Sequence, residues 1–505
     1  MIKENTELKR RVRVLEEQVH LLQSLHFGTK SEKLTAEDKR QAGLFNEAEE
    51  SAFDQQIQAP VQTREVKAHT RTTRNGAGRK PIAADLPREI YEYDIAEEEK
   101  ICACGSEKSC IGEDVSERVC IIPAKVVVRR EKRKKYVCRN CEGTTEDEVG
   151  VVSAEGPRHL IAGSIADESL LAWSVNEKFE YALPFYRQSK RLQAIGIPIA
   201  RATLSGQAIR TAEACEPLYE LLRHTILSGP VINADETRVQ VLKEPGRKAQ
   251  TDSWMWVFLG GAAESKSVIF QYETRRSHEV AYEFLKGYTG WLQTDDYEAY
   301  HTAVKRLRTE DHQEIEHVLC WAHVRRQFYT YWQLTKDAEA EQILGSIGEL
   351  FALEKLRKDF SKNGFLKQRN NRAGPILDAL WTRLTDLSAQ VPPGLAFGKA
   401  IAYTLDNWTL LKKYLEHPEL TPSNNAAENA IRPFVLGRKN WLFSATPRGA
   451  RSSAILYSLV ESAKLHNLSV YDYFYYILRK IPYCESRNDY EALLPFNLTA
   501  ETIKP

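Results

Sequence analysis

The spacing of apolar residues changes along the chain, and over the first thirty residues it is that of a coiled coil. Over residues 1–30, positions spaced alternately four and three apart carry mostly apolar side chains, which is the heptad seam of a left-handed coil. One seam position holds Asn5, where a polar residue can fix the register at a cost in stability. We predict a leucine-zipper-like, dimerising helix, and a surface helix packed on its own protein is the alternative. The seam consists of Met1, Asn5, Leu8, Val12, Leu15, Val19 and Leu22.

Helical spacing dominates three further regions of the chain. Residues 160–225 include a helix, a tight turn at Gly196-Ile-Pro198 and a second helix. This helix-turn-helix-like pattern would direct Arg201, Thr203 and Gln207 toward DNA. Residues 329–415 are predicted to form an all-α insertion, and residues 451–505 a C-terminal helical tail.

After Gly229-Pro230 short apolar runs replace the helical spacing. They predict strands at 231–242, 254–259 and 267–272, then a helix near 277–288, and further strands at 291–297 and 317–320. Three strands, helix, strand, helix, strand is the element order of an RNase H-like α/β domain. We expect this domain to be the catalytic core and to occupy 226–328 and 416–450, on either side of the predicted all-α insertion. In such a sheet, an acid of the first strand and one at the end of the fourth can converge.

Length and composition narrow the class of protein. A chain of 505 residues exceeds one ordinary core, so a multidomain α+β protein of two to four units is expected. Its hydrophobic content of 42% and charged content of 28% are typical of soluble globular proteins. No apolar run reaches the length of a membrane span, and the polar, helical start is unlike a signal peptide. We therefore expect a cytoplasmic protein without a membrane partner.

The charge total hides strong local imbalance. The 70 Lys+Arg nearly cancel the 69 Asp+Glu, which as an average argues against a nucleic-acid-binding protein. Locally, however, residues 31–95 form a linker whose acidic stretch precedes a basic arm at 64–80. A solvated linker is favoured there over an arm that enters a minor groove. Between Lys125 and Lys135, seven Lys/Arg accompany one Glu, which is dense enough to follow a phosphate backbone. The expected DNA contacts are Arg129, Arg130, Lys132, Arg133 and Lys134, and a solvated face is the alternative.

Close cysteine pairs flank this basic segment and predict a zinc-binding ribbon over 96–150. Nine cysteines are too few for a disulfide scaffold in so long a chain. Cys102 and Cys104 form one pair and Cys138 and Cys141 the other, and four thiolates bind Zn²⁺ tetrahedrally in place of a core. The first pair has a single intervening residue, which is tighter than usual, so Cys110 is an alternative ligand to Cys102.

Carboxylates after apolar strands indicate phosphodiester chemistry. Asp235 and Asp295 each follow such a strand, with Glu236 and Asp296 as adjacent alternatives. Two Mg²⁺ or Mn²⁺ ions held by a few carboxylates can align the attacking and leaving oxygens. Glu428 is the expected third acid, on a helix that also presents Asn425 and Arg432. The structural alternative is a capping box, with Asn425 as the N-cap of that helix and Glu428 at N3.

Basic and aromatic residues follow the third acid. From Asn429 to Arg451 there are five Lys/Arg and no acid, interleaved with Phe434, Trp441 and Phe443. Such a mixture suits DNA ends whose bases are splayed and stacked. The expected contacts are Arg432, Arg438, Lys439 and Trp441. Cys320-Trp-Ala-His323 has metal-ligand spacing, but no second pair is near it in sequence, which favours packing or substrate positioning over zinc.

Over nearly its full length the chain resembles the insertion-sequence-66 family of transposases. The resemblance rests on His26–Leu34 (HFGTKSEKL), Ile111–Glu117 (IGEDVSE), Asn233–Thr237 (NADET), Leu292–Asp295 (LQTD), Cys320–His323 (CWAH), Asn424–Glu428 (NNAAE) and Gly437–Phe443 (GRKNWLF). It implies a three-carboxylate (DDE) active site at Asp235, Asp295 and Glu428 on an RNase H-like fold. The chain departs from the family pattern at the tight first cysteine pair and at Asp296, where the family commonly has glycine.

The resemblance also implies a reaction. We expect a DDE transposase that binds the inverted-repeat ends of its element, cleaves there to free a 3′ hydroxyl and joins that hydroxyl to target DNA. Its partners would be DNA, further copies of itself in a homodimer or higher oligomer, and the small accessory proteins that such elements often encode. It would act in a bacterial cytoplasm, on the nucleoid when bound to DNA. The alternatives are a zinc-ribbon DNA-binding regulator with an inactive nuclease-like domain, and a stand-alone nuclease.

Overall fold

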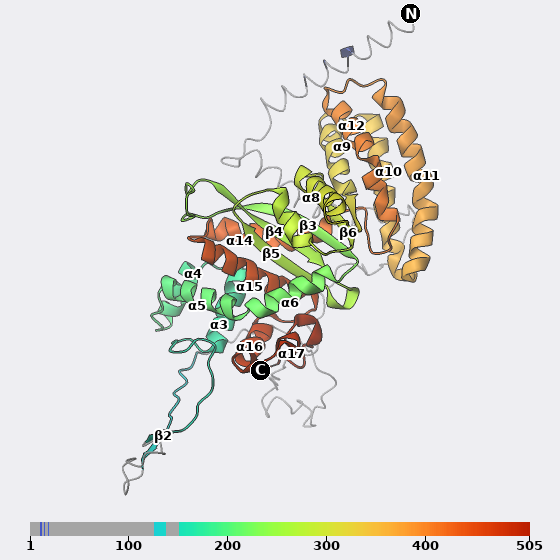
Figure 1. Ribbon diagram of the computed structural model, residues 1–505. Coiled ribbons are helices and arrows are strands. Elements are labelled where there is room, and N and C mark those ends of the chain that lie inside the picture. Colours follow the sequence, from blue (N-terminus) through green and yellow to red (C-terminus); the bar gives the residue numbers. More distant parts are fainter. Residues whose placement is uncertain (1–10, 13–14, 16–18, 20–125, 138–150, 505) are drawn as a thin grey trace, which may run out of the picture. The chain divides into compact units, whose positions relative to one another are not determined.

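A computed structural model describes residues 11–12, 15, 19, 126–137 and 151–504 (Figure 1). The chain divides into two units, Arg40–Gly156 and the remainder, and each is considered by itself. The linker 31–95, the basic arm 64–80 and most of the zipper lie outside the described residues. So do the cysteines of the ribbon: Cys102, Cys104, Cys110, Cys138 and Cys141.

A five-stranded mixed sheet forms the centre of the larger unit. Its spatial order is β5-β4-β3-β6-β7; β3 pairs antiparallel with β4 and parallel with β6. The predicted order of three strands, helix, strand, helix, strand is confirmed. The elements are β3 (Val231–Gln240), β4 (Asp252–Gly260), β5 (Ser267–Glu273), α7 (His278–Leu285), β6 (Gly290–Thr294), α8 (Glu298–Thr309) and β7 (Ile315–Leu319).

Helices cover both faces of this sheet. They do so because β4 and β5 carry apolar side chains on each of their two faces. On one face Phe258 stacks on Phe284 of α7, with ring centroids 3.6 Å apart. On the other, Phe270 of β5 packs against Phe434 of α14 (Asn425–Trp441) and Tyr457 of α15 (Pro447–Leu465). Because both faces are buried, the sequences of these strands are nearly continuous apolar runs.

Helix α15 also supplies hydrogen-bond partners to the edge strand of the sheet. Ser462 and Ser458 accept hydrogen bonds from the backbone N–H groups of Val268 and Phe270, at 3.0 and 2.7 Å. The edge strand β5 thereby gains partners for donors that a neighbouring strand would otherwise satisfy. The predicted boundary between core and tail at 450/451 falls inside this helix. After it come α16 (Val470–Lys480) and α17 (Arg487–Glu491).

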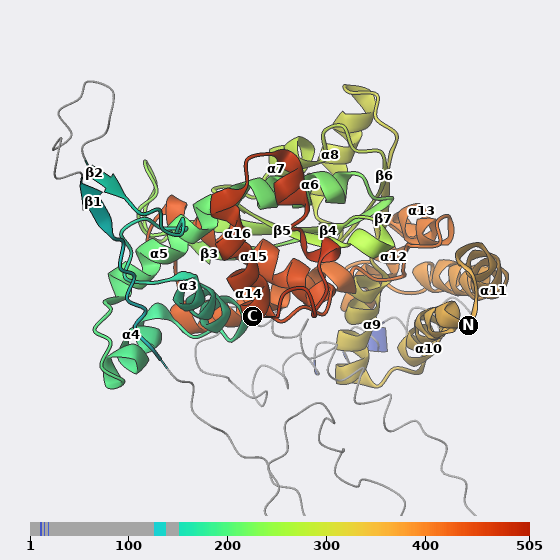
Figure 2. The same ribbon diagram turned by 90° about the horizontal axis from the view of Figure 1, so that it is seen from below.

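The all-α insertion follows β7 directly and lies beside the sheet (Figure 2). Its helices form a second hydrophobic cluster, which also includes Val231, Val318 and Leu319 of the strands. Its first helix begins at Trp321, ahead of the predicted start at 329. Trp321 is fully buried, and its indole N–H donates to the carbonyl of Leu411 at 2.9 Å. The helices are α9 (Trp321–Thr335), α10 (Ala338–Leu353), α11 (Lys362–Ser388), α12 (Ala396–Asp406) and α13 (Trp408–Lys412).

The helical segment before the sheet contains the predicted helix-turn-helix-like pair. Gly196 has φ +86°, a left-handed conformation that favours glycine, and it lies between the two helices. Arg201 and Thr203 are exposed. Gln207 is buried and donates to the Ser164 hydroxyl at 3.2 Å, so its expected DNA contact is wrong. The helices are α3 (Glu168–Val175), α4 (Phe185–Ala194), α5 (Arg201–Ala214) and α6 (Glu216–Leu227).

In the smaller unit, the described residues form a two-stranded antiparallel sheet of β1 (Lys135–Val137) and β2 (Val151–Ser153). Most of the basic segment lies outside this sheet, since residues 126–134 have no regular secondary structure and β1 begins only at Lys135. Along the chain, β1 and β2 flank the second cysteine pair. Residues 105–125, between the two pairs, lie outside the described residues.

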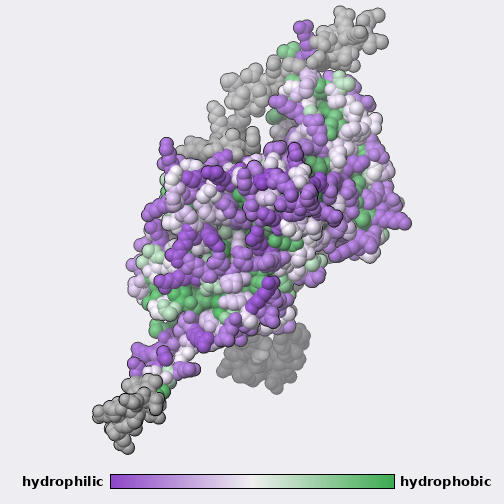
Figure 3. All heavy atoms as spheres, in the orientation of Figure 1, coloured by the Kyte–Doolittle hydropathy of each residue, from purple (hydrophilic) through white to green (hydrophobic). Residues whose placement is uncertain are grey.

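No helix of the described residues is long and apolar enough to span a membrane. Hydrophilic side chains cover most of the face drawn in Figure 3. Near the N-terminus, the described residues 11, 12, 15 and 19 are helical. The seam residues Val12, Leu15 and Val19 among them are 51%, 60% and 51% exposed in the single chain.

Candidate active site

Two of the three predicted acids are brought together by the parallel pairing of β3 with β6. The register places Asn233 opposite Gln293. Asp235 lies two residues further along β3, and Asp295 lies two residues after Gln293, directly past the end of β6. The sheet therefore presents both carboxylates at one end of this strand pair.

Glu428 reaches the same place from a distant part of the sequence. It lies in the first turn of α14, which packs against β3 and β4. The N-cap residue of this helix is Asn424, and its side chain makes no capping hydrogen bond. The capping-box alternative of Asn425 with Glu428 is therefore wrong.

The pKa values of the acids reflect this convergence. Burial raises the pKa of Asp235 well above its ordinary value, and the charges of Glu236, Glu428 and Asp295 raise it further. Burial, then Glu236 and Glu428, raises the pKa of Asp295 to about 7, against a pull downward from its hydrogen bond with the Tyr297 N–H and from Arg276. Carboxylates that repel each other in this way form a cluster that a cation would stabilise.

Glu236 and Asp296, the acids next to Asp235 and Asp295, bond to other side chains. Glu236 is buried and paired with Arg276, whose Nε donates to it at 2.8 Å, and the Tyr300 hydroxyl donates to its second oxygen. Asp296 is bonded to His301 at 2.7 Å and to the Asn407 amide at 2.9 Å. By contrast, the Asp235 carboxylate accepts one hydrogen bond from the described residues, from the Glu236 N–H at 2.8 Å. These contacts favour Asp235 and Asp295 over their neighbours as metal ligands.

Three amide side chains, which the sequence reasoning missed as site residues, tie the acid-bearing segments together. Asn233 donates to Gln293 at 3.2 Å and to the side-chain oxygen of Asn424 at 2.9 Å. Asn424 in turn donates to the carbonyl of Ala234 at 2.8 Å. A polar amide two residues before each Asp, in an otherwise apolar strand, is the sequence signal that could have indicated this network.

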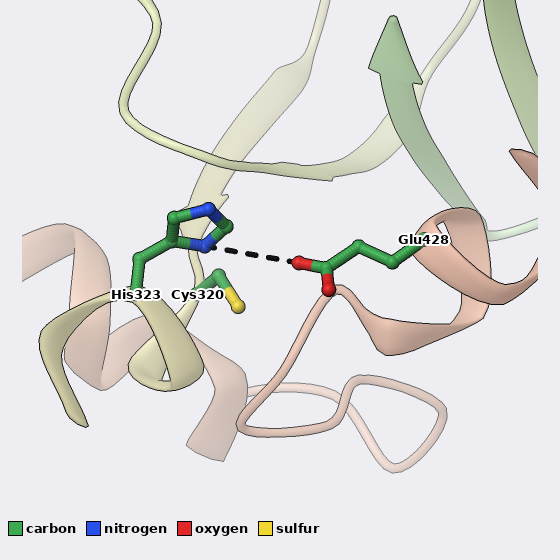
Figure 4. A group of neighbouring side chains, drawn as sticks. All are labelled: Cys320, His323 and Glu428. Carbon is green, nitrogen blue, oxygen red and sulfur yellow. Dashed lines mark ion pairs between the residues drawn. The ribbon is translucent and has the colours of Figure 1, made fainter. Parts of the chain in front are cut away.

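Cys320 and His323 lie beside Glu428 (Figure 4). Cys320 is the N-cap residue of α9, and His323 follows in the first turn of that helix. The His323 Nδ1 atom is 3.9 Å from a carboxylate oxygen of Glu428. Burial, with a smaller effect of Arg326, lowers the pKa of His323 to about 3, so the imidazole is neutral. Burial and the charge of Glu428 raise the pKa of the Cys320 thiol to about 12.

The basic residues after Glu428 divide between structure and surface. Arg438 donates to the Thr237 hydroxyl at 3.3 Å and to the carbonyl of Arg238, so it joins α14 to β3. Trp441 packs against the core and meets the buried Phe434 ring edge to face, which argues against the expected stacking of either on DNA bases. Lys439 and Phe443 are exposed, and Arg432 is partly exposed.

In the smaller unit the predicted DNA contacts are surface residues. Arg129, Arg130, Lys132, Arg133 and Lys134 are all exposed. The Nε of Arg133 donates to the carbonyl of Ala154, the residue after β2, at 2.8 Å. The described part of the segment therefore presents positive charge to solvent, as binding to a phosphate backbone requires.

Comparison with protein families covers four segments of the chain. The family described as "Transposase IS66 family" matches residues 163–452, a range that contains Asp235, Asp295 and Glu428. The "IS66 C-terminal element" matches 458–496. The "zinc-finger binding domain of transposase IS66" matches 99–142, which holds all four predicted zinc-ligating cysteines. The "Transposase C of IS166 homeodomain" matches 14–90.

Relatives of similar length occur in Sinorhizobium fredii. Uncharacterized protein y4jD is 32% identical over 98% of this chain and 97% of its own length. Uncharacterized protein y4qI is 29% identical over 96% of this chain and 88% of its own. With matches for the zinc-finger, transposase and C-terminal segments in their expected order, the chain belongs to the IS66 family of transposases.

Proposed function

We propose that this chain is a DDE transposase that cleaves the inverted-repeat ends of its own element and joins the freed 3′ hydroxyl to target DNA. The observation that carries the proposal is the meeting of Asp235, Asp295 and Glu428, which come from β3, the end of β6 and α14. The strand order and connections also fit an RNase H-like catalytic domain, which we propose as its fold.

The donor set suits two Mg²⁺ or Mn²⁺ ions. It consists of hard carboxylate oxygens. The charge of Glu428 raises the pKa of Asp235 and of Asp295, and the charge of Asp295 raises that of Asp235, effects that a divalent cation would reverse. When bound, such ions supply an activated oxygen nucleophile and neutralise the charge that develops on the phosphate. We assign Asp235 and Asp295 to both ions and Glu428 to the second.

The chain's own residues prepare this site. The amides of Asn233, Gln293 and Asn424 hold the three acid-bearing segments in register, so their carboxylates need little rearrangement before reaction. Arg276 neutralises Glu236, which leaves Asp235 and Asp295 as the acids available to a cation. Arg432 and Lys439 would contact phosphates along the exposed side of α14.

We further propose that zinc in the ribbon, bound by Cys102 or Cys110 with Cys104, Cys138 and Cys141, orders the segment that carries Arg129, Arg130, Lys132 and Lys134. This segment would bind the element ends, and Arg201, exposed on α5 of the larger unit, would be a further DNA contact. The exposed seam of Val12, Leu15 and Val19 supports a homodimer or a higher oligomer on DNA, since a coiled coil buries such a seam against a second helix.

The test is incubation of the full chain with labelled element ends and Mg²⁺ or Mn²⁺, scoring nicks at the end boundary. We expect cleavage by the native chain, loss of it in Asp235→Asn, and retention in Asp252→Asn, which alters an exposed acid of the same sheet. Cleavage by Asp235→Asn would contradict the assignment. Binding without cleavage by the native chain would favour the regulator, and equal hydrolysis of DNA lacking the ends would favour a stand-alone nuclease.

A further inference from the structure

Three potential metal ligands of different chemistry converge beside the acidic cluster. The Cys320 sulfur, a ring nitrogen of His323 and a carboxylate oxygen of Glu428 all lie within 4.8 Å of one another. Figure 4 shows the thiol and the imidazole extending from the start of α9 toward the carboxylate of α14. The sequence offers no second ligand pair near Cys320 and His323, and here the tertiary structure supplies a third ligand from Glu428.

The environment of each donor suits a cation. The Nδ1 atom of His323 is buried and has no hydrogen-bond partner among the described residues, although a buried ring nitrogen ordinarily has one. The backbone N–H of Asn424 donates to the Cys320 sulfur at 3.1 Å. Burial and the charge of Glu428 raise the pKa of this thiol, so an ion that binds the sulfur would displace its proton.

The distances require only a small closure. A tetrahedral Zn²⁺ holds sulfur, nitrogen and oxygen ligands about 3.5 Å apart, given its bond lengths of about 2.0 to 2.3 Å. The His323 nitrogen and the Glu428 oxygen are 3.9 Å apart. Both belong to side chains with rotatable bonds, so a modest shift would bring the three donors around one ion and leave a fourth position open.

The ligand types determine which ion fits. Mg²⁺ prefers oxygen ligands, whereas a thiolate, an imidazole and a carboxylate together are typical of Zn²⁺ and similar transition metals. We propose that Cys320, His323 and Glu428 bind a single Zn²⁺-class ion, separate from the zinc of the ribbon. A consequence follows that rests on the proposed function: the ion would take Glu428 from the Mg²⁺ pair, so micromolar Zn²⁺ would inhibit end cleavage.

Binding is tested on the full chain, stripped of metal and reloaded with Co²⁺, which replaces Zn²⁺ and reports thiolate ligation by a charge-transfer band. We expect the native chain to hold one more equivalent than Cys320→Ser. Cys215→Ser should match the native chain, since Cys215 is an equally buried cysteine outside the cluster. His323→Gln should weaken the added site about 100-fold or more, because even indirect partners of metal ligands contribute 10- to 100-fold. Equal equivalents and equal spectra for the native chain, Cys320→Ser and His323→Gln would overturn the proposal.

A second measurement separates this site from the proposed function. In the cleavage assay with Mg²⁺, added Zn²⁺ should inhibit the native chain and Cys215→Ser, and inhibit Cys320→Ser much less, each relative to its own activity without Zn²⁺. Equal inhibition of all three would contradict the competition for Glu428. If no variant cleaves DNA but the Co²⁺ equivalent is lost in Cys320→Ser, the metal site stands and the transposase proposal fails.

Discussion

The side-chain amide of Asn233 donates to the side-chain oxygen of Asn424 across 2.9 Å, although the two residues are 191 positions apart. This bond connects the strand of Asp235 to the helix of Glu428. Both amides are buried, so neither can exchange its partner for water without cost. The geometry of the proposed active site therefore depends on residues that bear no charge.

Replacing Asn424 tests this dependence. Asn424→Ala removes the partner of Asn233 and of the Ala234 carbonyl, and we expect a loss of about 1 to 3 kcal/mol in the free energy of unfolding. End cleavage should fall with it, because Glu428 loses its alignment. The neighbouring Asn425 is exposed, so Asn425→Ala should change stability by less than about 0.5 kcal/mol. Equal effects in the two variants, measured by denaturant unfolding, would argue against the network.

The raised pKa of Asp295 predicts a pH-dependent stability. The folded carboxyl titrates at about 7 and the ordinary value is 3.8, so between these pH values the folded chain binds more protons. Stability therefore falls as pH rises through this window. In a chelator, Asp295→Asn should raise the melting temperature at pH 8 and change it little at pH 4.

The matched control for that experiment is Asp378→Asn, which removes an exposed acid of α11 and should shift the melting temperature at neither pH. Adding Mg²⁺ at pH 8 should stabilise the native chain more than Asp295→Asn, because ligand binding to the folded state adds stability. A melting temperature of Asp295→Asn below that of the native chain at pH 8 in chelator would contradict the buried-charge argument.

Arg276 is predicted to be structural. Its guanidinium bonds Glu236 and lies 3.7 Å from the centre of the Tyr297 ring. Arg276→Ala leaves Glu236 buried and unpaired, so we expect a loss of about 3 to 5 kcal/mol in unfolding free energy. Arg275→Ala, at the exposed neighbour, should have little effect. Adding Glu236→Gln to Arg276→Ala should restore part of the loss, and failure to do so would show that the ring contact dominates.

Two adjacent basic residues of α14 should behave differently. Lys439 is exposed, so Lys439→Ala should weaken DNA binding without lowering the melting temperature, and reduce the salt dependence of binding by about one charge. Arg438 is bonded to β3, so Arg438→Ala should lower the melting temperature. Thermal unfolding and binding titrations at several salt concentrations measure both. Identical profiles for the two variants would contradict this division.

The exposed zipper seam predicts self-association. Leu15→Lys places a charge in the seam and should shift the chain toward the monomer in light scattering, since a charge there opposes burial against a second helix. Arg11 is an exposed helical residue outside the seam, and Arg11→Ala is the control. A native chain that is already monomeric would exclude the dimer.

The local pattern was enough to predict the elements of the sheet domain. Strands β3 to β7 and the two helices between them appear in the predicted order, because two-sided burial gives strands a continuous apolar run and one-sided burial gives helices their spacing. Local pattern could not place residues whose burial depends on distant segments. The sequence pattern predicted both Gln207 and Trp441 as surface residues. Gln207 is buried and bonded to Ser164, and Trp441 is partly buried against Phe434.

The sequence by itself determined that the chain carries the residue types this chemistry needs, because acids, cysteine pairs and basic runs can be recognised without a fold. Only the tertiary structure decided which of them meet. The register of β3 with β6 places Asp235 beside Asp295, and the packing of α14 adds Glu428. The same packing brings Glu428 to Cys320 and His323 from more than a hundred residues away. Contacts at that separation are set by how layers pack, and no periodicity within a single segment encodes them.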